Sequence, residues 1–65
     1  MTHKDVLKMF KTYFPSIAGV MTEWFPNGKN SIRVRYSRIR PDVVFTYNDT
    51  KDWKLETVDS FIKSM

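Results

Sequence analysis

The feature that most constrains this fold is the turn signal Pro26 to Asn30, which stands between two runs of alternating apolar and polar residues. Asn and Gly both tolerate a positive φ, and an Asn-Gly pair in this setting is a strong indication of a β-hairpin. A three-residue loop, Asn27 to Lys29, sets Glu23 opposite Arg33 as a pair of opposite charges. A two-residue loop sets Glu23 against Ile32, so we prefer the three-residue loop.

The run Val43 to Tyr47 has the composition of a third strand, because Val, Phe, Thr and Tyr favour extended structure. If Ser37 pairs with Asp42, the third strand aligns Phe45 with Val34. Both predicted hairpins then agree on which alternate positions face the core. These positions are Val20, Thr22, Trp24, Ile32, Val34, Tyr36, Val43, Phe45 and Tyr47.

The first 14 residues predict an amphipathic helix. Thr2 is the expected N-cap, with Asp5 three positions later in a capping-box-like pattern. Pro15 ends the helix, because proline lacks the backbone N–H that a helix interior needs. The apolar positions recur at helical spacing and predict the buried side: Val6, Leu7, Phe10, Tyr13 and Phe14.

The C-terminal segment carries two overlapping patterns. Trp53, Leu55 and Thr57 alternate as a strand does, whereas Leu55, Val58, Ile62 and Met65 repeat as a helix does. We expect a C-terminal helix from about residue 56, after a short extended Trp53 to Leu55.

These elements predict an α+β fold, a three-stranded antiparallel β-meander flanked by an N-terminal and a C-terminal helix (α-β-β-β-α). A chain of 65 residues buries only roughly 60% of its unfolded surface, so residues 1–65 form one domain with one core. No cysteine is present to supply a disulfide or a thiolate metal site. The core is therefore expected to depend on the aromatic residues, which make up 15% of the chain.

The predicted element order resembles the double-stranded RNA-binding domain in topology. That family places a lysine-rich stretch at the start of its second helix, where this chain has Leu55 to Asp59 with two acidic residues. The hairpin tip Pro26 to Lys29 also lacks the family's pattern. The resemblance therefore extends to topology, and we carry over neither the function nor the site residues of the family.

Catalytic groups are scarce in this sequence. The single histidine, His3, lies close to the N-terminus, and no glycine-rich phosphate loop is present. The acidic turn Asn48 to Asp52 lacks the spacing of an EF-hand. We therefore expect a binding protein and not an enzyme, with no catalytic residue, no metal and no cofactor.

Positive charge is concentrated in residues 31–40. The net charge of the chain is +4, and this segment alone contributes +4 from four arginines and no acid, so the rest of the chain sums to zero. The guanidinium group suits phosphate, and an aromatic ring on the same open sheet face can stack on a base. We expect a nucleic-acid-binding module, for DNA or RNA, that uses Arg33, Arg35, Arg38 and Arg40, supported by Lys29 and Phe25.

Two alternatives stay open. The arginines can be neutralised within the chain, Arg33 by Glu23 and the loop arginines by Asp42 or the C-terminal acids. Alternatively, Met21 and Phe25 beside arginines on an open sheet face are typical of a protein interface. That pattern favours a small protein-interaction factor or inhibitor, of the kind encoded by phages or mobile elements, or a homodimer.

The cellular location is the last expectation. The N-terminal residues alternate lysine with apolar residues and do not resemble a targeting signal, and the sequence contains no long apolar run. We therefore expect a cytoplasmic protein without a membrane partner.

Overall fold

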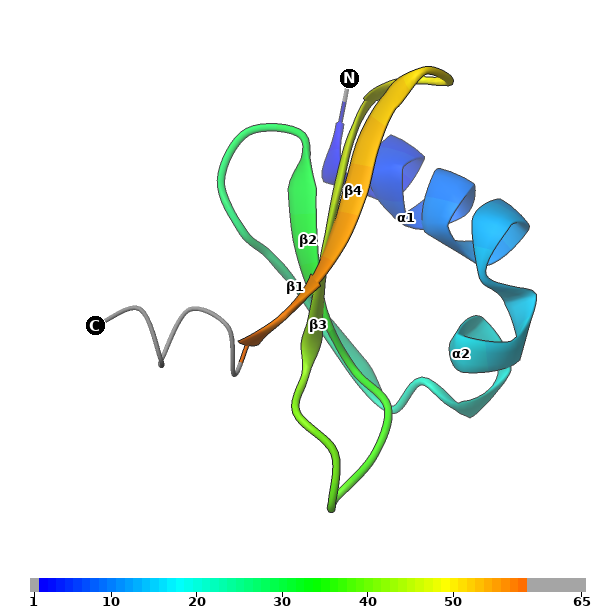
Figure 1. Cartoon of the computed structure of the whole chain (residues 1–65), viewed down its shortest axis with the longest axis vertical. Coiled ribbons are helices and arrows are strands. Elements are labelled where there is room, and N and C mark those ends of the chain that lie inside the picture. Colours follow the sequence, from blue (N-terminus) through cyan, green and yellow to red (C-terminus); the bar gives the residue numbers. More distant parts are fainter. Residues whose placement is uncertain (1, 59–65) are drawn as a thin grey trace.

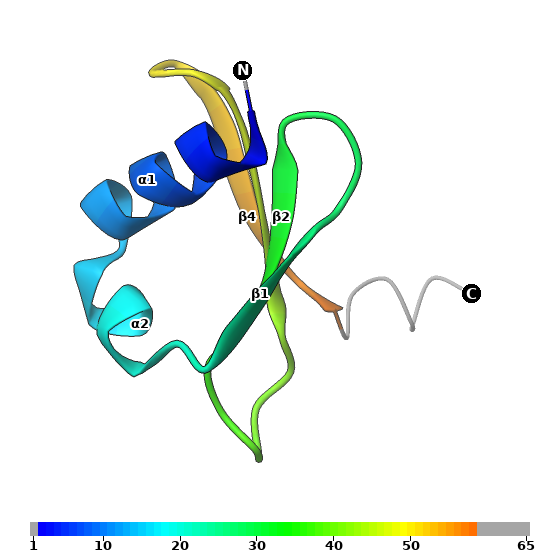
Figure 2. The same cartoon turned by 180° about the vertical axis from the view of Figure 1, so that it is seen from behind.

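The computed structural model describes residues 2–58, which form a small α+β fold (Figure 1). Four strands make one antiparallel sheet in the order β1-β2-β3-β4, and both helices lie on the same face of it (Figures 1 and 2). The α+β class is confirmed, whereas the prediction of three strands is wrong. The elements are α1 (His3–Tyr13), α2 (Pro15–Val20), β1 (Glu23–Pro26), β2 (Ser31–Arg35), β3 (Val43–Asp49) and β4 (Asp52–Thr57).

The helix α1 begins at the predicted capping box. The backbone N–H of Asp5 donates to Oγ1 of Thr2 at 3.2 Å, and the N–H of Thr2 donates to Oδ2 of Asp5 at 3.0 Å. Pro15 ends α1, as predicted, but it also occupies the first turn of α2, where its missing N–H costs nothing. The second short helix was therefore not anticipated from the sequence.

The β1–β2 hairpin is present, with a longer loop than predicted. Four residues, Asn27 to Asn30, separate the strands, and the N–H of Asn27 donates to the carbonyl of Ser31 at 2.9 Å. Gly28 and Asn30 both adopt positive φ, +82° and +55°. The loop conformation thus depends on the residue types that mark the turn in the sequence.

The register of both hairpins differs from the prediction by two residues. Glu23 lies opposite Arg35 and not Arg33, and Phe45 lies opposite Ile32 and not Val34. Val20 and Thr22, which were predicted to face the core, lie before β1 and are exposed, so that part of the prediction is wrong. Within the strands themselves, side chains alternate with a period of two, so a shift of two residues leaves them on their predicted face. The error therefore changes which residues are neighbours but not which face is the core.

The strand β4 corrects the prediction for the C-terminal segment. Glu56 pairs with Val44 and Thr57 pairs with Val43, so the chain is still extended where a helix was expected to start. The alternation of Trp53 and Leu55 continues because β3 offers a strand edge to pair with. The rest of the predicted helix lies outside the described residues. The topological resemblance to the double-stranded RNA-binding domain does not hold for a four-stranded sheet that follows two helices.

The core lies between α1 and the sheet and is centred on Phe45. The centroids of the Phe10, Phe14 and Trp53 rings lie 5.6, 5.8 and 6.0 Å from that of Phe45. Aromatic pairs at such distances add about 0.5–1.5 kcal/mol each beyond area burial. The largest side chains that are almost fully buried come from the helix and both central strands: Phe10, Phe45, Ile32, Val6 and Val34.

Candidate anion-binding site

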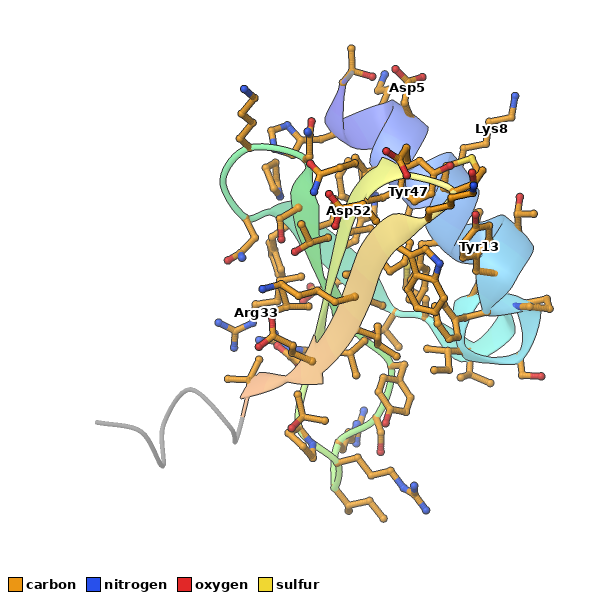
Figure 3. All side chains as sticks on the ribbon, turned by 45° about the horizontal axis from the view of Figure 1, so that its top comes forward. Asp5, Lys8, Tyr13, Arg33, Tyr47 and Asp52 are labelled. Atoms are coloured by element: carbon orange, nitrogen blue, oxygen red, sulfur yellow. The ribbon has the colours of Figure 1, made fainter. Side chains whose placement is uncertain are left out.

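The four predicted arginines line one hollow of about 700 Å³. Arg33 and Arg35 reach it from β2, and Arg38 and Arg40 reach it from the loop that joins β2 to β3. Alternation along β2 sends Arg33 to the sheet face that points away from α1 (Figure 3). The sequence prediction that these arginines form one surface agrees with this arrangement.

One buried carboxylate organises the floor of the hollow. Nε of Arg33 donates to Oδ2 of Asp42 at 2.8 Å, and Arg35 donates to both oxygens of the same group, each at 3.3 Å. Asp42 is only 7% exposed, while the two arginine side chains are 40% and 45% exposed. The strand arginines are thus held on one side by Asp42 and open to solvent on the other.

The pKa of Asp42 reflects a balance of two effects. Burial disfavours the carboxylate and raises the pKa, but hydrogen bonds and charge from Arg33 and Arg35 outweigh burial and hold the pKa below its ordinary value. Hydrogen bonding to Asp42 likewise raises the pKa of Arg35. Asp42 and Arg35 are therefore both charged near neutral pH.

Arg35 has two further neighbours on β1. Its Nη1 donates to Oε2 of Glu23 at 3.1 Å, and its Cζ lies 5.5 Å from the centroid of the Phe25 ring. Glu23 was expected to neutralise Arg33, but the shifted register brings it to Arg35. Arg35 therefore covers part of the Phe25 ring, which was expected to stack on a base.

The loop arginines differ from the strand arginines. Both are exposed, and within residues 2–58 neither Arg38 nor Arg40 makes a hydrogen bond or an ion pair. The alternative in which Asp42 neutralises the loop arginines is not what the structure shows, because Asp42 binds Arg33 and Arg35. Among the described residues, four arginines and two carboxylates, Glu23 and Asp42, give the lining of the hollow a net charge of +2.

Two other predicted site residues lie elsewhere. Lys29 is in the β1–β2 loop, at the end of β2 opposite the loop arginines (Figure 1). Met21 was expected on the open sheet face, but this placement is wrong, because residue 21 caps α2 before β1 begins. There its half-buried side chain packs against the core.

Sequence reasoning missed the link from Asp42 to the strand arginines and gave no role to Ile39. Ile39 lies between the two loop arginines and is 92% exposed. The sequence did indicate this exposure, because an isoleucine between two arginines in a predicted loop has no apolar neighbours along the chain.

No protein-family model, curated protein or solved structure matches the chain. In residues 2–58, neither helix is long and apolar enough to cross a membrane. The same part of the chain contains no group of three His, Asp or Glu side chains placed to hold a metal ion.

Proposed function

We propose that this protein is a nucleic-acid-binding module that contacts phosphates at the arginine-lined hollow. The observation that carries the proposal is the pair of guanidinium groups, Arg38 and Arg40, that have no partner within residues 2–58 and lie beside the two that Asp42 holds. A planar guanidinium binds phosphate through two parallel hydrogen bonds, and Asp42 orients Arg33 and Arg35 before any ligand arrives. Little conformational entropy is then lost when a phosphate binds there.

The lining of the hollow supports binding without covalent chemistry. The two carboxylates that residues 2–58 contribute to it, Glu23 and Asp42, are both in ion pairs, so neither is available as a general base. His3 lies away from the hollow, where its Nε2 forms a 2.6 Å hydrogen bond with the carbonyl oxygen of Gly28. The groups that face the hollow are therefore suited to holding an anion in place.

The experiment that tests the proposal is a fluorescence anisotropy titration of labelled DNA and RNA, single-stranded and duplex, at several salt concentrations. Wild-type protein should bind at least one of these, and affinity should fall as salt rises because bound counterions are released. The double variant Arg38→Gln/Arg40→Gln should bind more weakly. The slope of log affinity against log salt should fall by roughly one unit for each lost phosphate contact.

A matched control removes the same charge elsewhere. Lys8→Gln/Lys11→Gln changes two exposed lysines of α1, on the other side of the sheet from Arg33 (Figure 3). This control should retain nearly all of the affinity and the salt slope. Equal losses in the two double variants would show general charge attraction and no site, and absence of binding by wild type at low salt would remove the proposal.

The alternative of a partner protein docked on the open sheet face has less support. This alternative depended on Met21 and Phe25. Met21 packs against the core, and the guanidinium group of Arg35 lies over the Phe25 ring. Val44, which lies opposite Arg33 in the sheet, is only 4% exposed. The described part of that face therefore offers little apolar surface to a protein.

A further inference from the structure

Ile39 stands out among the apolar side chains of the described residues. Its side chain is 92% exposed, whereas the next most exposed large apolar residue, Val20, is 58% exposed. Single exposed apolar residues are common on protein surfaces, so exposure alone assigns no role. A role for Ile39 is indicated instead by its position in the fold and by the residues that flank it.

Ile39 lies in a loop that projects beyond the end of the sheet. The β2–β3 loop extends away from the body of the molecule, at the end far from the β1–β2 loop (Figures 1 and 2). On one side of Ile39, its N–H donates to Oγ of Ser37 at 3.2 Å, and on the other side Pro41 restricts the backbone. At the base of the loop, Asp42 is fixed by Arg33 and Arg35. Ile39 is thus an exposed apolar side chain on a loop that is held in place by these contacts.

The flanking residues define what this side chain fits. Arg38 and Arg40 lie on either side of it in sequence, and both are without partners among the described residues. A complementary surface must therefore offer a narrow apolar slot with negative charge on both sides. The gap between two base pairs that have been partly unstacked has this chemistry, because the bases line the gap and phosphates border it.

We propose that Ile39 inserts between adjacent base pairs of duplex DNA while Arg38 and Arg40 bind the phosphates beside the opened step. This inference rests on the proposed function and extends it by naming the form of nucleic acid and the residue that deforms it. Affinity should then be greatest where a base step opens at low cost, such as a pyrimidine–purine step or a mismatch.

An anionic membrane is another partner that combines apolar and negative character. One isoleucine and two arginines bury little apolar surface in a bilayer. Stable membrane anchoring usually needs two strong contributions, such as a lipid chain together with a polybasic patch. Duplex DNA instead needs only a single apolar side chain at each opened step. The observations therefore favour DNA, and vesicle binding serves as the contrasting arm of the test.

The test uses duplex DNA with a central TA step, 2-aminopurine at that step, and a donor and an acceptor dye at the two ends. Wild type should increase 2-aminopurine fluorescence by unstacking the step and should increase energy transfer by bending the duplex. Ile39→Ala should lose both signals and bind about tenfold more weakly, with an unchanged salt slope. Val20→Ala, which removes the next most exposed apolar residue, should behave as wild type.

The outcomes separate the two proposals. Salt-sensitive binding of duplex DNA by wild type, with both signals unchanged in Ile39→Ala, would overturn the inserted isoleucine and leave the arginine site standing. No binding of DNA or RNA by wild type would overturn both. Sedimentation with phosphatidylserine vesicles that depends on Ile39, while DNA binding does not, would assign this side chain to a membrane and reject its insertion into DNA.

Discussion

Nε of Arg33 donates a 2.8 Å hydrogen bond to Oδ2 of Asp42, nine residues later in the chain. This side-chain bond joins the two ends of the β2–β3 loop. The backbone of Asp42 makes a further contact, because its carbonyl accepts a hydrogen bond from the N–H of Val58 at 2.9 Å. Asp42 therefore connects β2, the loop and the chain after β4. Changes at this residue should affect the fold and the hollow together.

Asp42→Asn should destabilise the protein by about 2 kcal/mol, because a buried hydrogen-bonded carboxylate is lost and two arginines keep weaker partners. Urea unfolding at pH 7 measures this difference. Asp49→Asn is the matched control, since Asp49 is exposed and accepts a backbone hydrogen bond from Lys51 at 2.7 Å that an asparagine can also accept. Equal effects of the two variants would contradict a special role for the Asp42 network.

The stability of the protein should fall in acid. The pKa of Asp42 in the folded state lies below its unfolded value of 3.8, so its contribution is present above that value and is lost as pH falls through the folded pKa. The exposed Asp5 also has a lowered pKa, caused by hydrogen bonds from the backbone and side chain of Thr2. Unfolding free energies measured from about pH 6 down to about pH 2 should therefore decline below about pH 4. The decline should be shallower in Asp42→Asn, and an identical pH profile would contradict the assignment.

The two glycines should respond to alanine in opposite directions. Gly28 has φ +82°, so Gly28→Ala should destabilise the hairpin by about 1 kcal/mol through backbone strain. Gly19 lies in α2 with open space around it, so Gly19→Ala should stabilise the helix by about 0.5–1 kcal/mol. Thermal unfolding by circular dichroism compares the two. A stabilising Gly28→Ala would show that the positive φ is not required.

Phe45 should be the most sensitive core position. Phe45→Ala removes the ring at the centre of the aromatic cluster and should cost about 3–5 kcal/mol. A domain of this size has a total stability of about 3–5 kcal/mol, so the variant should be largely unfolded at 25 °C. Phe45→Leu keeps most of the volume and should remain folded with a lower midpoint. Near-UV circular dichroism distinguishes the two, and a native spectrum for Phe45→Ala would contradict this view of the core.

The local features of the fold could be predicted from the sequence because each depends on a few adjacent residues. Thr2 with Asp5 and the positive-φ residues of the hairpin loop specify their own conformations. Register was not accessible in this way. Alternation penalises a slip of one residue but not of two, so the predicted partners of Glu23 and Phe45 were displaced while their faces were correct.

The remaining errors arise from long-range interactions. Leu55 belongs to both a strand pattern and a helix pattern in the sequence, and pairing with β3 continues the strand through Glu56 and Thr57, where a helix was expected to begin. Lys29 was grouped with the arginines, but it lies in the β1–β2 loop, and successive hairpin loops lie at opposite ends of their shared strand. Asp42 was considered as a partner for the loop arginines, whereas alternation places it on the face of Arg33 and Arg35.

The hydrogen bond between His3 and the Gly28 carbonyl holds the start of α1 against the β1–β2 loop, at the end of the molecule far from Ile39 (Figure 1). A dye, bead or sensor surface attached ahead of α1 would therefore present the β2–β3 loop outward, toward whatever is offered in solution. Attachment through Lys29, close to the same hydrogen bond, would give a similar orientation. Immobilised protein should thus keep its loop arginines accessible when partners are screened.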